Sequence, residues 1–475
     1  MILKCLLLAL LVAGCFAIHT AEEWENGRVV YQVLTDRYAR TNGDTSSCND
    51  IRRYCGGTFK GLENNLDKIA DLGFNAIWIS PIVSQIDAND GDGFHGYWFK
   101  DIYEINSHFG TSEDLKSLVK AAHAKDIWIM LDVVFNHPGP IGNDFSQINP
   151  FNKPEHYHSD CEITNWNDQN NVEYCRLSGL PDLAQSGDNM NQWVHDTLIS
   201  WIEDVVKEYD IDGLRCDTVP EVHTTFWDDM SAAIDGGYAV GEVYNGREDY
   251  VASYTHHLPA VLSYPMFFTL NNVFINRNDM SQIESTYRSY ENNVRDILAL
   301  GTFAENHDQP RFLHQRNDVK AFASMLAYTL TADGVPIMYY GAEKGFNGAN
   351  DPYNREPYWS RSGYDSYLYQ VIKAIATLRK ENKEEWGSQK MTFGHVEDDL
   401  ITYWKGKVFT TLTNVGSDGA EVQRYAKKHP YAPGETVCNV VWGAKDCVVI
   451  ENDGTMEVAL ESGEPKVWVP KSWVQ

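Results

Sequence analysis

The sequence predicts an α/β protein: a (β/α)8 TIM barrel with a loop-rich domain inserted after its third strand and an all-β sandwich domain at the C-terminus. Three observations lead to this prediction. Eight short apolar segments alternate with helical patterns, one connection is more than fifty residues long, and the pattern changes near residue 384. Apolar strands separated by helices are typical of buried parallel sheets, and eight such units can close into a barrel.

Eight segments have the composition of buried strands. They are residues 29–34, 76–80, 127–134, 213–217, 238–243, 260–264, 300–305 and 335–340. Two of the intervening helices are well marked. The first has Thr111 as its predicted N-cap, with Asp114 three residues later, and the second covers residues 190–206. The apolar face of the first carries Leu115, Leu118, Val119 and Ala122.

These patterns also divide the chain into domains. Residues 18–136 and 190–383 are expected to form the barrel. The connection 137–189 is rich in Asn, Pro, His and Asp, and because a loop this long is usually functional, it is interpreted as a small inserted domain. From residue 384, short apolar runs separated by Gly, Asn and Asp predict a separate β-sandwich that extends over 384–475.

Residues 1–17 have the features of a secretory signal peptide. Lys4 precedes an apolar run that ends in small residues and is too short to span a bilayer. Cleavage after Ala17 fits best. The alternative is lipid attachment at Cys15, because residues 12–15 loosely match a bacterial lipoprotein motif. The protein is therefore expected to be secreted, and no later segment is apolar enough to cross a membrane.

Cysteine spacing supports an oxidising compartment. Of nine cysteines, seven follow the predicted signal peptide, and six of these are neighbours in sequence. The pairs Cys48/Cys55, Cys161/Cys175 and Cys438/Cys447 are predicted to form local disulfides. Cys216 is left over and is interpreted as a small buried packing residue rather than a nucleophile.

Net charge limits the partners. The value of −28 argues against nucleic acid and against anionic membrane surfaces, and it allows a neutral substrate or a cation. Its simplest role is to keep a secreted protein soluble. The content of 14 Trp and 26 Tyr is only a weak indication of sugar binding.

Charged residues stand at the ends of several predicted strands, where such barrels carry their reactive groups. They are Asp132, His137, Arg215, Asp217, Glu242, His307, Asp308 and Arg311, with the neutral amides Asn136 and Asn306 beside them. Each alone could be a salt bridge, a cap or a solvated rim residue. Three acids that converge on one mouth with Arg and His are hard to ascribe to packing, because burying unpaired charge is costly.

This set suits glycoside hydrolysis, in which one carboxylate attacks the anomeric carbon and another acid protonates the leaving oxygen. Arg215 is expected to lower the pKa of Asp217 and keep that nucleophile ionised. Glu242 has no cation adjacent in sequence and is expected to be the acid. Asp308 could bind sugar hydroxyls. A retaining mechanism requires the Asp217 and Glu242 carboxyls to lie about 5–5.5 Å apart.

Four segments, "DVVFNH", "GLRCD", "GEV" and "ENHD", resemble in order the four signature regions of the α-amylase family, glycoside hydrolases of the (β/α)8 type. Five further segments are similar to secreted fungal-type α-amylases: "YQVLTDRYAR", "YCGGTFKGL", "FHGYWFKDIY", "LPDL" and "GVPIMYYGAE". One segment would be weak evidence, whereas the full set runs through nearly the whole mature chain.

The resemblance implies an endo-acting, retaining hydrolase of the internal α-1,4-glucosidic bonds of starch or glycogen. Asp217 would be the nucleophile, Glu242 the acid/base and Asp308 the transition-state stabiliser. Sugar contacts would come from His95, Tyr97, Trp98, His137, Arg215, His307, Asp351 and Arg355, with Tyr97 as a stacking platform.

The resemblance also implies a calcium ion that pins the insert to the barrel. Its ligands would be Asn136, Glu173, Asp182 and Glu221. One departure lies at Pro220-Glu221, where fungal enzymes usually carry Lys-His. Residue 221 can still offer a backbone carbonyl to the metal, but loss of the lysine leaves the product pattern open. A further barrel disulfide of the family has no cysteines here.

Two alternatives remain. One is a related α-glucan enzyme with a different product pattern, whether maltogenic, α-1,6-specific or transglycosylating. The other is a non-catalytic homologue that binds sugar or a partner protein, although such proteins generally lose one of the three acids, and all three are present here. The expected partner is an α-glucan polysaccharide, with no nucleic acid or membrane, and the protein is expected to be a monomer. The chain has no Asn-x-Ser/Thr sequon, so N-glycans are not expected.

Overall fold

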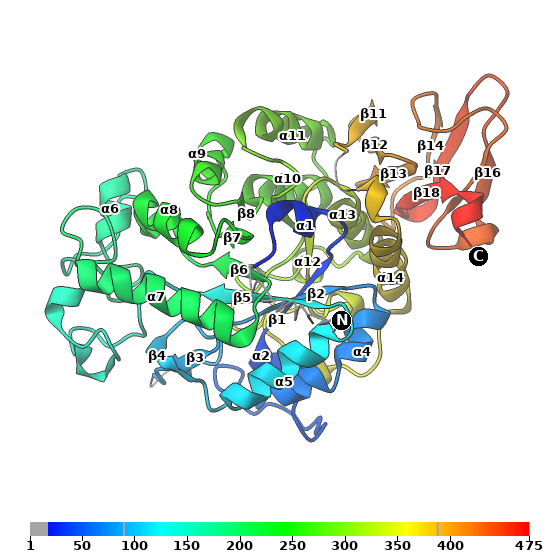
Figure 1. Cartoon of the computed structure of the whole chain (residues 1–475). Helices are drawn as coiled ribbons and strands as arrows, with labels where there is room; N and C mark the ends of the chain where they lie inside the picture. The colour runs from blue at the N-terminus through cyan, green and yellow to red at the C-terminus, as the bar shows by residue number, and fades with distance from the viewer. Residues whose placement is uncertain (1–17, 89–90, 387–388, 475) are drawn as a thin grey trace, which may run out of the picture.

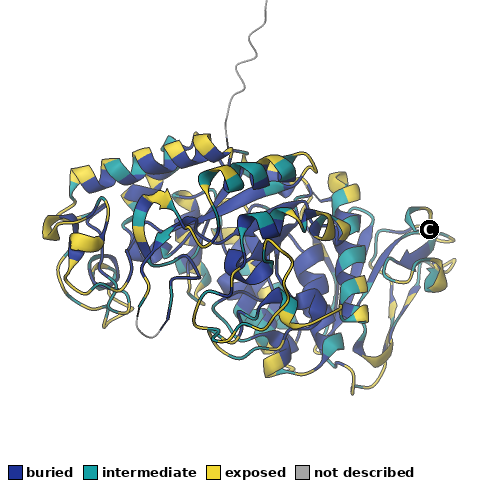
Figure 2. Ribbon diagram, turned by 90° about the horizontal axis from the view of Figure 1, so that it is seen from below, coloured by how far each residue is buried: buried dark blue, intermediate teal, exposed yellow. Residues whose placement is uncertain are grey.

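The structure, a computed structural model, describes residues 18–88, 91–386 and 389–474 (Figure 1). The predicted signal peptide, with Cys5 and Cys15, lies outside the described residues. At the centre is a sheet of eight parallel strands, surrounded by helices. The β-rich C-terminal part and the α6–α7 side lie at opposite ends of the barrel in both ribbon views (Figures 1 and 2).

All eight predicted barrel strands are confirmed. They are β1 (Val30–Val33), β2 (Ala76–Ile79), β5 (Trp128–Val133), β6 (Gly213–Cys216), β7 (Ala239–Gly241), β8 (Ala260–Val261), β9 (Gly301–Phe303) and β10 (Val335–Tyr339). The hydrogen-bonded order is β8-β7-β6-β5-β2-β1-β10-β9. A parallel bridge between Leu262 and Gly301 joins the two ends of this order, so the sheet closes into a barrel.

Helices follow the strands and cover the barrel (Figure 1). They are α1 (Ala21–Glu25), α2 (Thr35–Tyr38), α3 (Phe59–Glu63), α4 (Leu66–Asp71), α5 (Ser112–His123), α7 (Gln192–Tyr209), α8 (Thr224–Ala233), α9 (Glu248–Ser253), α10 (Tyr264–Phe274), α11 (Ser281–Asn293), α12 (Phe312–Gln315), α13 (Val319–Thr331) and α14 (Ser366–Glu381). Helix α5 begins as predicted, because Thr111 and Asp114 form a reciprocal capping box. Helix α7 starts after Asn191, its N-cap, and ends three residues beyond the predicted end, where Asp210 adopts a left-handed conformation.

Two segments depart from strand–helix alternation. Strands β3 (Val83–Gln85) and β4 (Phe99–Ile105) form an antiparallel hairpin between β2 and α5, which the sequence pattern did not predict. The connection 137–189 contains α6 (Gln169–Tyr174) and short 3-10 turns, and the Cys161–Cys175 disulfide closes part of it. Both segments stand on the side of the barrel where the strands end, so they can shape a site there.

The C-terminal part is all β. A six-stranded sheet has the order β11-β12-β13-β18-β15-β16, and β14 pairs with β17 in a second sheet. The strands are β11 (Thr392–Val396), β12 (Leu400–Lys405), β13 (Val408–Thr413), β14 (Val422–Ala426), β15 (Thr436–Asn439), β16 (Cys447–Val449), β17 (Met456–Leu460) and β18 (Lys466–Pro470). The two sheets enclose a separate apolar core.

A buried ionic contact joins this part to the barrel. Lys405 of β12 places its Nζ 2.6 Å from Oδ1 of Asp333, which precedes β10. The Tyr287 hydroxyl and the amide of Met391 donate to the same carboxylate. Asp333 and Lys405 are both almost fully buried, so this contact is shielded from salt.

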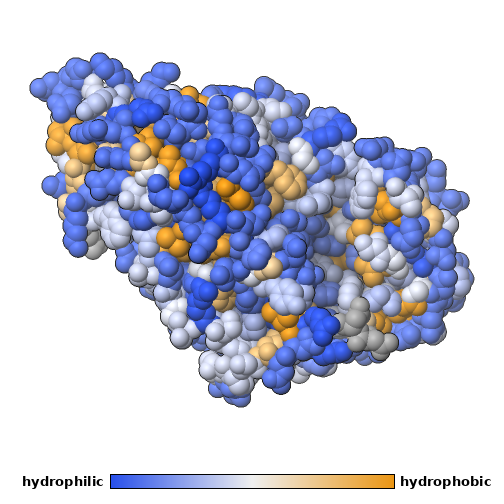
Figure 3. Space-filling model, turned by 180° about the vertical axis from the view of Figure 1, so that it is seen from behind, coloured by the Kyte–Doolittle hydropathy of each residue, from blue (hydrophilic) through white to orange (hydrophobic). Residues whose placement is uncertain are grey.

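All three predicted disulfides form: Cys48–Cys55, Cys161–Cys175 and Cys438–Cys447. Among the cysteines that the structure describes, Cys216 is free and buried, as predicted. None of the described helices combines the length and hydrophobicity that a bilayer crossing needs. The face shown in Figure 3 is largely hydrophilic, and its hydrophobic atoms form small separate groups.

Candidate active site

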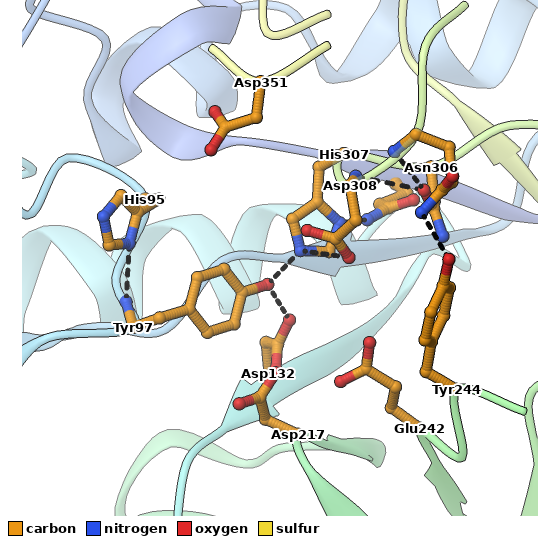
Figure 4. A network of polar contacts seen from close by, with 12 residues as sticks. His95, Tyr97, Asp132, Asp217, Glu242, Tyr244, Asn306, His307, Asp308 and Asp351 are labelled. Atoms are coloured by element: carbon orange, nitrogen blue, oxygen red, sulfur yellow. Dashed lines mark hydrogen bonds and ion pairs between the residues drawn. The ribbon is translucent and has the colours of Figure 1, made fainter. Parts of the chain in front are cut away.

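Polar side chains gather where the barrel strands end (Figure 4). The amide of Asp217 donates to Val133 O at 3.0 Å, and the amide of Glu242 donates to Cys216 O at 2.8 Å. Sheet hydrogen bonding therefore continues one residue beyond β6 and β7 and fixes the backbone of both acids. Along β6 the side chains alternate, so Arg215 and Asp217 face the mouth of the barrel while Cys216 packs into the apolar core.

Arg215 connects three carboxylates. Its Nη1 lies 2.9 Å from Asp132 Oδ1 and 2.6 Å from Asp217 Oδ1, and its Nη2 lies 2.9 Å from Glu242 Oε2. Glu242 has no cation adjacent in sequence, but the fold places Arg215, which is distant in sequence, directly against it. One guanidinium holds both candidate catalytic acids on two neighbouring strands.

Burial dominates the titration of Asp217. It raises the pKa of Asp217 well above its usual value, and the nearby charges of Glu242 and Asp132 raise it further, while Arg215 acts in the opposite direction. The expectation of a lowered pKa is thus wrong in its net direction: the Arg215 effect has the predicted sign, but loss of solvent outweighs it. Asp132 and Asp217 are both buried beside one guanidinium, so a single positive charge faces two carboxyls that have lost solvent.

A hydrogen-bonded chain supports Asp132. Tyr97 OH donates to Asp132 Oδ2 at 2.7 Å, and it lies 2.8 Å from Nε2 of His307. Nε2 of Gln32 lies 2.8 Å from Nδ1 of the same imidazole. If the amide donates to Nδ1, the His307 proton sits on Nε2 and points to Tyr97, which suits the donor role of the tyrosine hydroxyl. Burial raises the pKa of Asp132 to about 6 and lowers that of His307.

Glu242 has two further donors. The amide of Thr218 donates to its Oε2 at 3.2 Å, and Tyr264 OH donates to its Oε1 at 3.3 Å. Asn306 Nδ2 in turn donates to Tyr264 OH at 3.0 Å. Thr218 directly follows Asp217 and has left-handed backbone angles (φ 47°, ψ 49°), which cost energy for a β-branched residue. That strained turn aims the Thr218 amide at the Glu242 carboxylate.

Asp308 lies across the cleft from the two other acids (Figure 4). Its Oδ1 is 3.3 Å from Arg355 Nη2, and its Oδ2 is 3.4 Å from His307 Nε2. Arg355 also reaches Asp351 at 3.1 Å and donates from Nε to His307 O. Asp308 is one-third exposed, so a ligand in the cleft can reach it.

The remaining predicted contact residues lie beside this group. His95 Nδ1 accepts from the Tyr97 amide at 3.0 Å, so its proton is on Nε2, and the His95 ring stacks on that of Tyr97. Trp98 packs edge-on against His95. Burial lowers the pKa of His95 well below its usual value and that of His137 to about 4, which favours neutral rings.

A cleft with a volume of about 570 Å³ opens beside Glu242 and Asp308. The sequence analysis missed most of its wall. The other lining residues are Trp166, Val172, Leu177, Thr218, Pro220, Glu221, Tyr244, Asn245, Tyr250 and Gln309. Trp166 and Tyr244 are 60% and 55% exposed, although both are large and apolar. In the sequence each of them is only an aromatic residue in a polar loop, a pattern too common to predict a substrate contact.

Three oxygens meet where the insert touches the barrel. The side-chain oxygen of Asn136 lies 2.9 Å from Asp182 Oδ1 and 3.1 Å from the carbonyl oxygen of Glu221. Burial raises the pKa of Asp182 to about 7 and that of the Glu221 side chain to about 8. Two arrangements would satisfy these oxygens: an amide turned so that its nitrogen donates to both neighbours, or a cation between them.

Glu173 is placed differently from those three. Its Oε1 accepts from Gln169 Nε2 at 2.9 Å, and the same amide donates to Pro220 O. Within the described residues, no group of three or more His, Cys, Asp or Glu is arranged to hold a metal. A calcium site here would therefore depend on the Asn136 amide and on a backbone carbonyl as much as on carboxylates, which suits a hard cation.

Comparison with known proteins identifies the family of the chain. Residues 32–391 match the family model "Alpha amylase, catalytic domain", and residues 397–475 match "Alpha-amylase, domain C". The chain belongs to the α-amylase family. It is 36% identical over 471 residues to an α-amylase of Saccharomycopsis fibuligera, an alignment that covers 95% of this chain and 93% of that protein. The predicted family resemblance is confirmed.

Other fungal relatives are similarly close. α-Amylase 2 of Schwanniomyces occidentalis is 36% identical over 471 residues, covering 94% of this chain and 90% of that protein. Among solved structures, an α-amylase from Malbranchea cinnamomea superimposes with a TM-score of 0.90 at 37% identity, covering 95% of this chain and 98% of that one. The family member thus matches its relatives over both the barrel and the C-terminal β domain.

Proposed function

We propose that this protein is a secreted, endo-acting α-amylase that hydrolyses internal α-1,4-glucosidic bonds of starch or glycogen with retention of configuration. The observation that carries the proposal is the pairing of Asp217 and Glu242 on one guanidinium, with Asp308 across an open cleft. The retention of all three acids argues against the alternative of a non-catalytic homologue.

In the proposed mechanism, Asp217 attacks the anomeric carbon as Glu242 gives its proton to the departing glucosidic oxygen, so the C–O bond breaks and a glucosyl ester forms. Glu242 then takes a proton from a water, which attacks the same carbon and releases Asp217. Arg215 stabilises the carboxylate forms of both acids in turn. Tyr264 and the Thr218 amide hold the Glu242 carboxyl in line with the leaving oxygen.

Substrate contacts on the other side of the acids would come from Asp308 and its neighbours. Asp308 would bind sugar hydroxyls and strengthen that contact as the ring flattens. The other contacts proposed are His95, Tyr97, Trp98, His137, Arg215, His307, Asp351 and Arg355. In the neutral His95 ring the Tyr97 amide occupies the acceptor Nδ1, so the Nε2–H group is left to donate to a sugar hydroxyl.

The cleft that would receive the leaving group is partly aromatic. Pro220 lines the cleft together with Trp166 and Tyr244, and no lysine stands at position 220. Aromatic faces bind sugar rings without fixing their hydroxyls as closely as hydrogen bonds would. The missing lysine bears on the product pattern, so the alternative maltogenic, α-1,6 and transglycosylating activities are distinguished from endo-hydrolysis by their products.

We also propose that calcium is bound by Asn136, Asp182 and the Glu221 carbonyl, with Glu173 nearby. When bound, the ion supplies positive charge that balances these oxygens. The residues tie the end of β5 to the inserted segment and to the turn after Asp217, so the site would stabilise the walls of the cleft rather than take part in bond cleavage.

The cellular setting and the domain boundaries belong to the same proposal. Three disulfides suit an oxidising compartment, and cleavage after Ala17 would release the mature chain. The barrel would comprise 18–136 and 190–383, the inserted domain 137–189 and the C-terminal domain 384–475. We propose a monomer.

The deciding experiment is product analysis on soluble starch with the anomeric configuration recorded. We expect α-configured oligosaccharides, with no cleavage of pullulan. Glu242→Gln and Asp217→Asn should each reduce hydrolysis to near background, whereas Glu203→Gln, at a partly exposed position on α7, should have no effect. Unchanged hydrolysis in the purified Glu242→Gln protein would refute the assignment, and pullulan cleavage would favour the α-1,6 alternative.

A further inference from the structure

A second cavity, with a volume of about 260 Å³, lies between the segment that follows β1 and the segments that follow β10. Its charged lining residues are four cations and a single carboxylate: Arg40, Lys68, Lys344, Arg361 and Asp44. The four cations define what we call the basic pocket. Because the chain carries a net charge of −28, a local excess of positive charge is the opposite of what its composition predicts.

Backbone carbonyls hold three of these cations in place. Arg40 Nε donates to Cys55 O at 2.8 Å. Lys344 Nζ donates to the carbonyls of Tyr358 and Arg361 at 2.8 and 2.7 Å, and Arg361 Nη1 donates back to Lys344 O at 2.7 Å. Carbonyl oxygens satisfy N–H groups but carry no formal charge. The pocket is therefore pre-organised yet keeps its positive charge.

Nearby acids neutralise only part of that charge. Asp44 is paired with Arg40 at 3.0 Å and accepts from Ser46. Glu343 is fully buried, accepts from Tyr31 OH at 2.7 Å, and has its pKa raised by burial. Burial lowers the pKa of Lys344 to about 8, and of the charges around it Glu343 raises that pKa while Lys68 and Arg361 lower it.

We propose that the basic pocket binds a phosphate-type oxyanion. Such a ligand would offer several strong acceptor oxygens to cations from helix α4 and from the segments that follow β1 and β10, and it would relieve their mutual repulsion. The loops after the last strands of this barrel class often bind phosphate groups, and β10 is the last strand here. The same chemistry has two sources, inorganic phosphate or a phosphate monoester carried by a glucan.

The first test uses inorganic phosphate as the probe and the melting temperature as the readout, so it does not depend on the proposed activity. At constant ionic strength, phosphate in place of chloride should raise the melting temperature by about 1–3 °C. Lys68→Gln should at least halve the rise, and Lys68→Gln/Arg361→Gln should abolish it. Lys427→Gln, an exposed lysine of the C-terminal domain, is the matched control and should keep it. No rise in the wild-type protein, or an equal rise in all variants, would overturn the proposal.

The second test identifies the source and rests on the proposed function. Hydrolysis of a phosphorylated starch is compared with hydrolysis of the same starch after enzymatic dephosphorylation. A kcat/KM at least about three-fold higher on the phosphorylated form, lost in the Lys68→Gln/Arg361→Gln variant, would identify the glucan ester as the ligand. Phosphate-dependent melting without this preference would identify the free anion. If starch is not hydrolysed at all, the melting test still decides whether the pocket binds phosphate.

Discussion

Replacing Arg215 with lysine tests the electrostatic core of the site. Arg215 is only 1% exposed, and its guanidinium reaches Asp132, Asp217 and Glu242 at 2.9, 2.6 and 2.9 Å. A lysine keeps the positive charge but concentrates it on one atom, so it cannot occupy the positions of Nη1 and Nη2 together. At least one of the three contacts must be lost.

The size of the effect follows from these contacts. A hydrogen bond to a charged group contributes about 1.5–3 kcal/mol, and each 1.36 kcal/mol in the barrier is tenfold in rate. Loss of one contact that matters in the transition state should therefore lower kcat/KM by about 10- to 150-fold. Arg215 lowers the pKa of Asp217 against the effect of burial, so a weaker contact should raise that pKa further. Because attack requires ionised Asp217, the acidic limb of the pH profile should move to higher pH.

The assay is kcat/KM on soluble starch as a function of pH, with thermal melting to check folding. Arg288→Lys, on the exposed face of α11 between Glu284 and Glu291, is the control and should leave both limbs in place. A folded Arg215→Lys protein that loses activity while its acidic limb stays fixed would refute the claim that Arg215 sets the ionisation of Asp217.

Three further outcomes are expected. Burial raises the pKa of Glu25 from 4.5 to about 8, so the protonated side chain stabilises the fold at low pH and this contribution is lost as the pH rises through this interval. Glu25→Gln should therefore raise the free energy of unfolding at pH 8 by about 2–4 kcal/mol and change it little at pH 4, as measured by urea unfolding. Excess chelator should lower the melting temperature of the wild-type protein but not that of Asp182→Asn, and unchanged wild-type melting would count against calcium. Tyr264→Phe removes a donor to Glu242, so kcat should fall about 3- to 10-fold with little change in KM, a loss of about 0.7–1.4 kcal/mol; a change confined to KM would contradict this role.

The barrel was predictable because its signals are local. Each strand is a short apolar run, and the strand order of such a barrel follows chain order once eight units are counted. The hairpin of β3 and β4 was not predicted, because it lacks such a local signal. Exposed and buried residues alternate irregularly along β4, and the pairing register between the two strands shifts twice. Capping chemistry placed the start of α5, whereas α7 ran past its predicted end to a left-handed Asp210 that no sequence rule marks strongly.

The site was predictable as a set of residues but not as a network. Asp217 and Glu242 were identified from strand ends, yet their shared contact with Arg215 depends on β6 and β7 lying side by side. The burial that raises the pKa of Asp217 likewise comes from surrounding elements rather than from its neighbours in sequence. The Asn136 contact with the Glu221 carbonyl could not be inferred from residue types, because every residue carries a carbonyl.

The Asp333–Lys405 contact has a consequence for how the chain is built. Cutting the polypeptide before Met391 would remove the only formal positive charge that directly meets the Asp333 carboxylate in the described structure, together with the Met391 amide that donates to it. The Asp333 carboxylate would keep the Tyr287 hydroxyl as a donor but would lose its counterion. The C-terminal β domain thus supplies, through Lys405, the positive charge that balances a buried carboxylate of the barrel. The two parts should therefore melt in one cooperative transition.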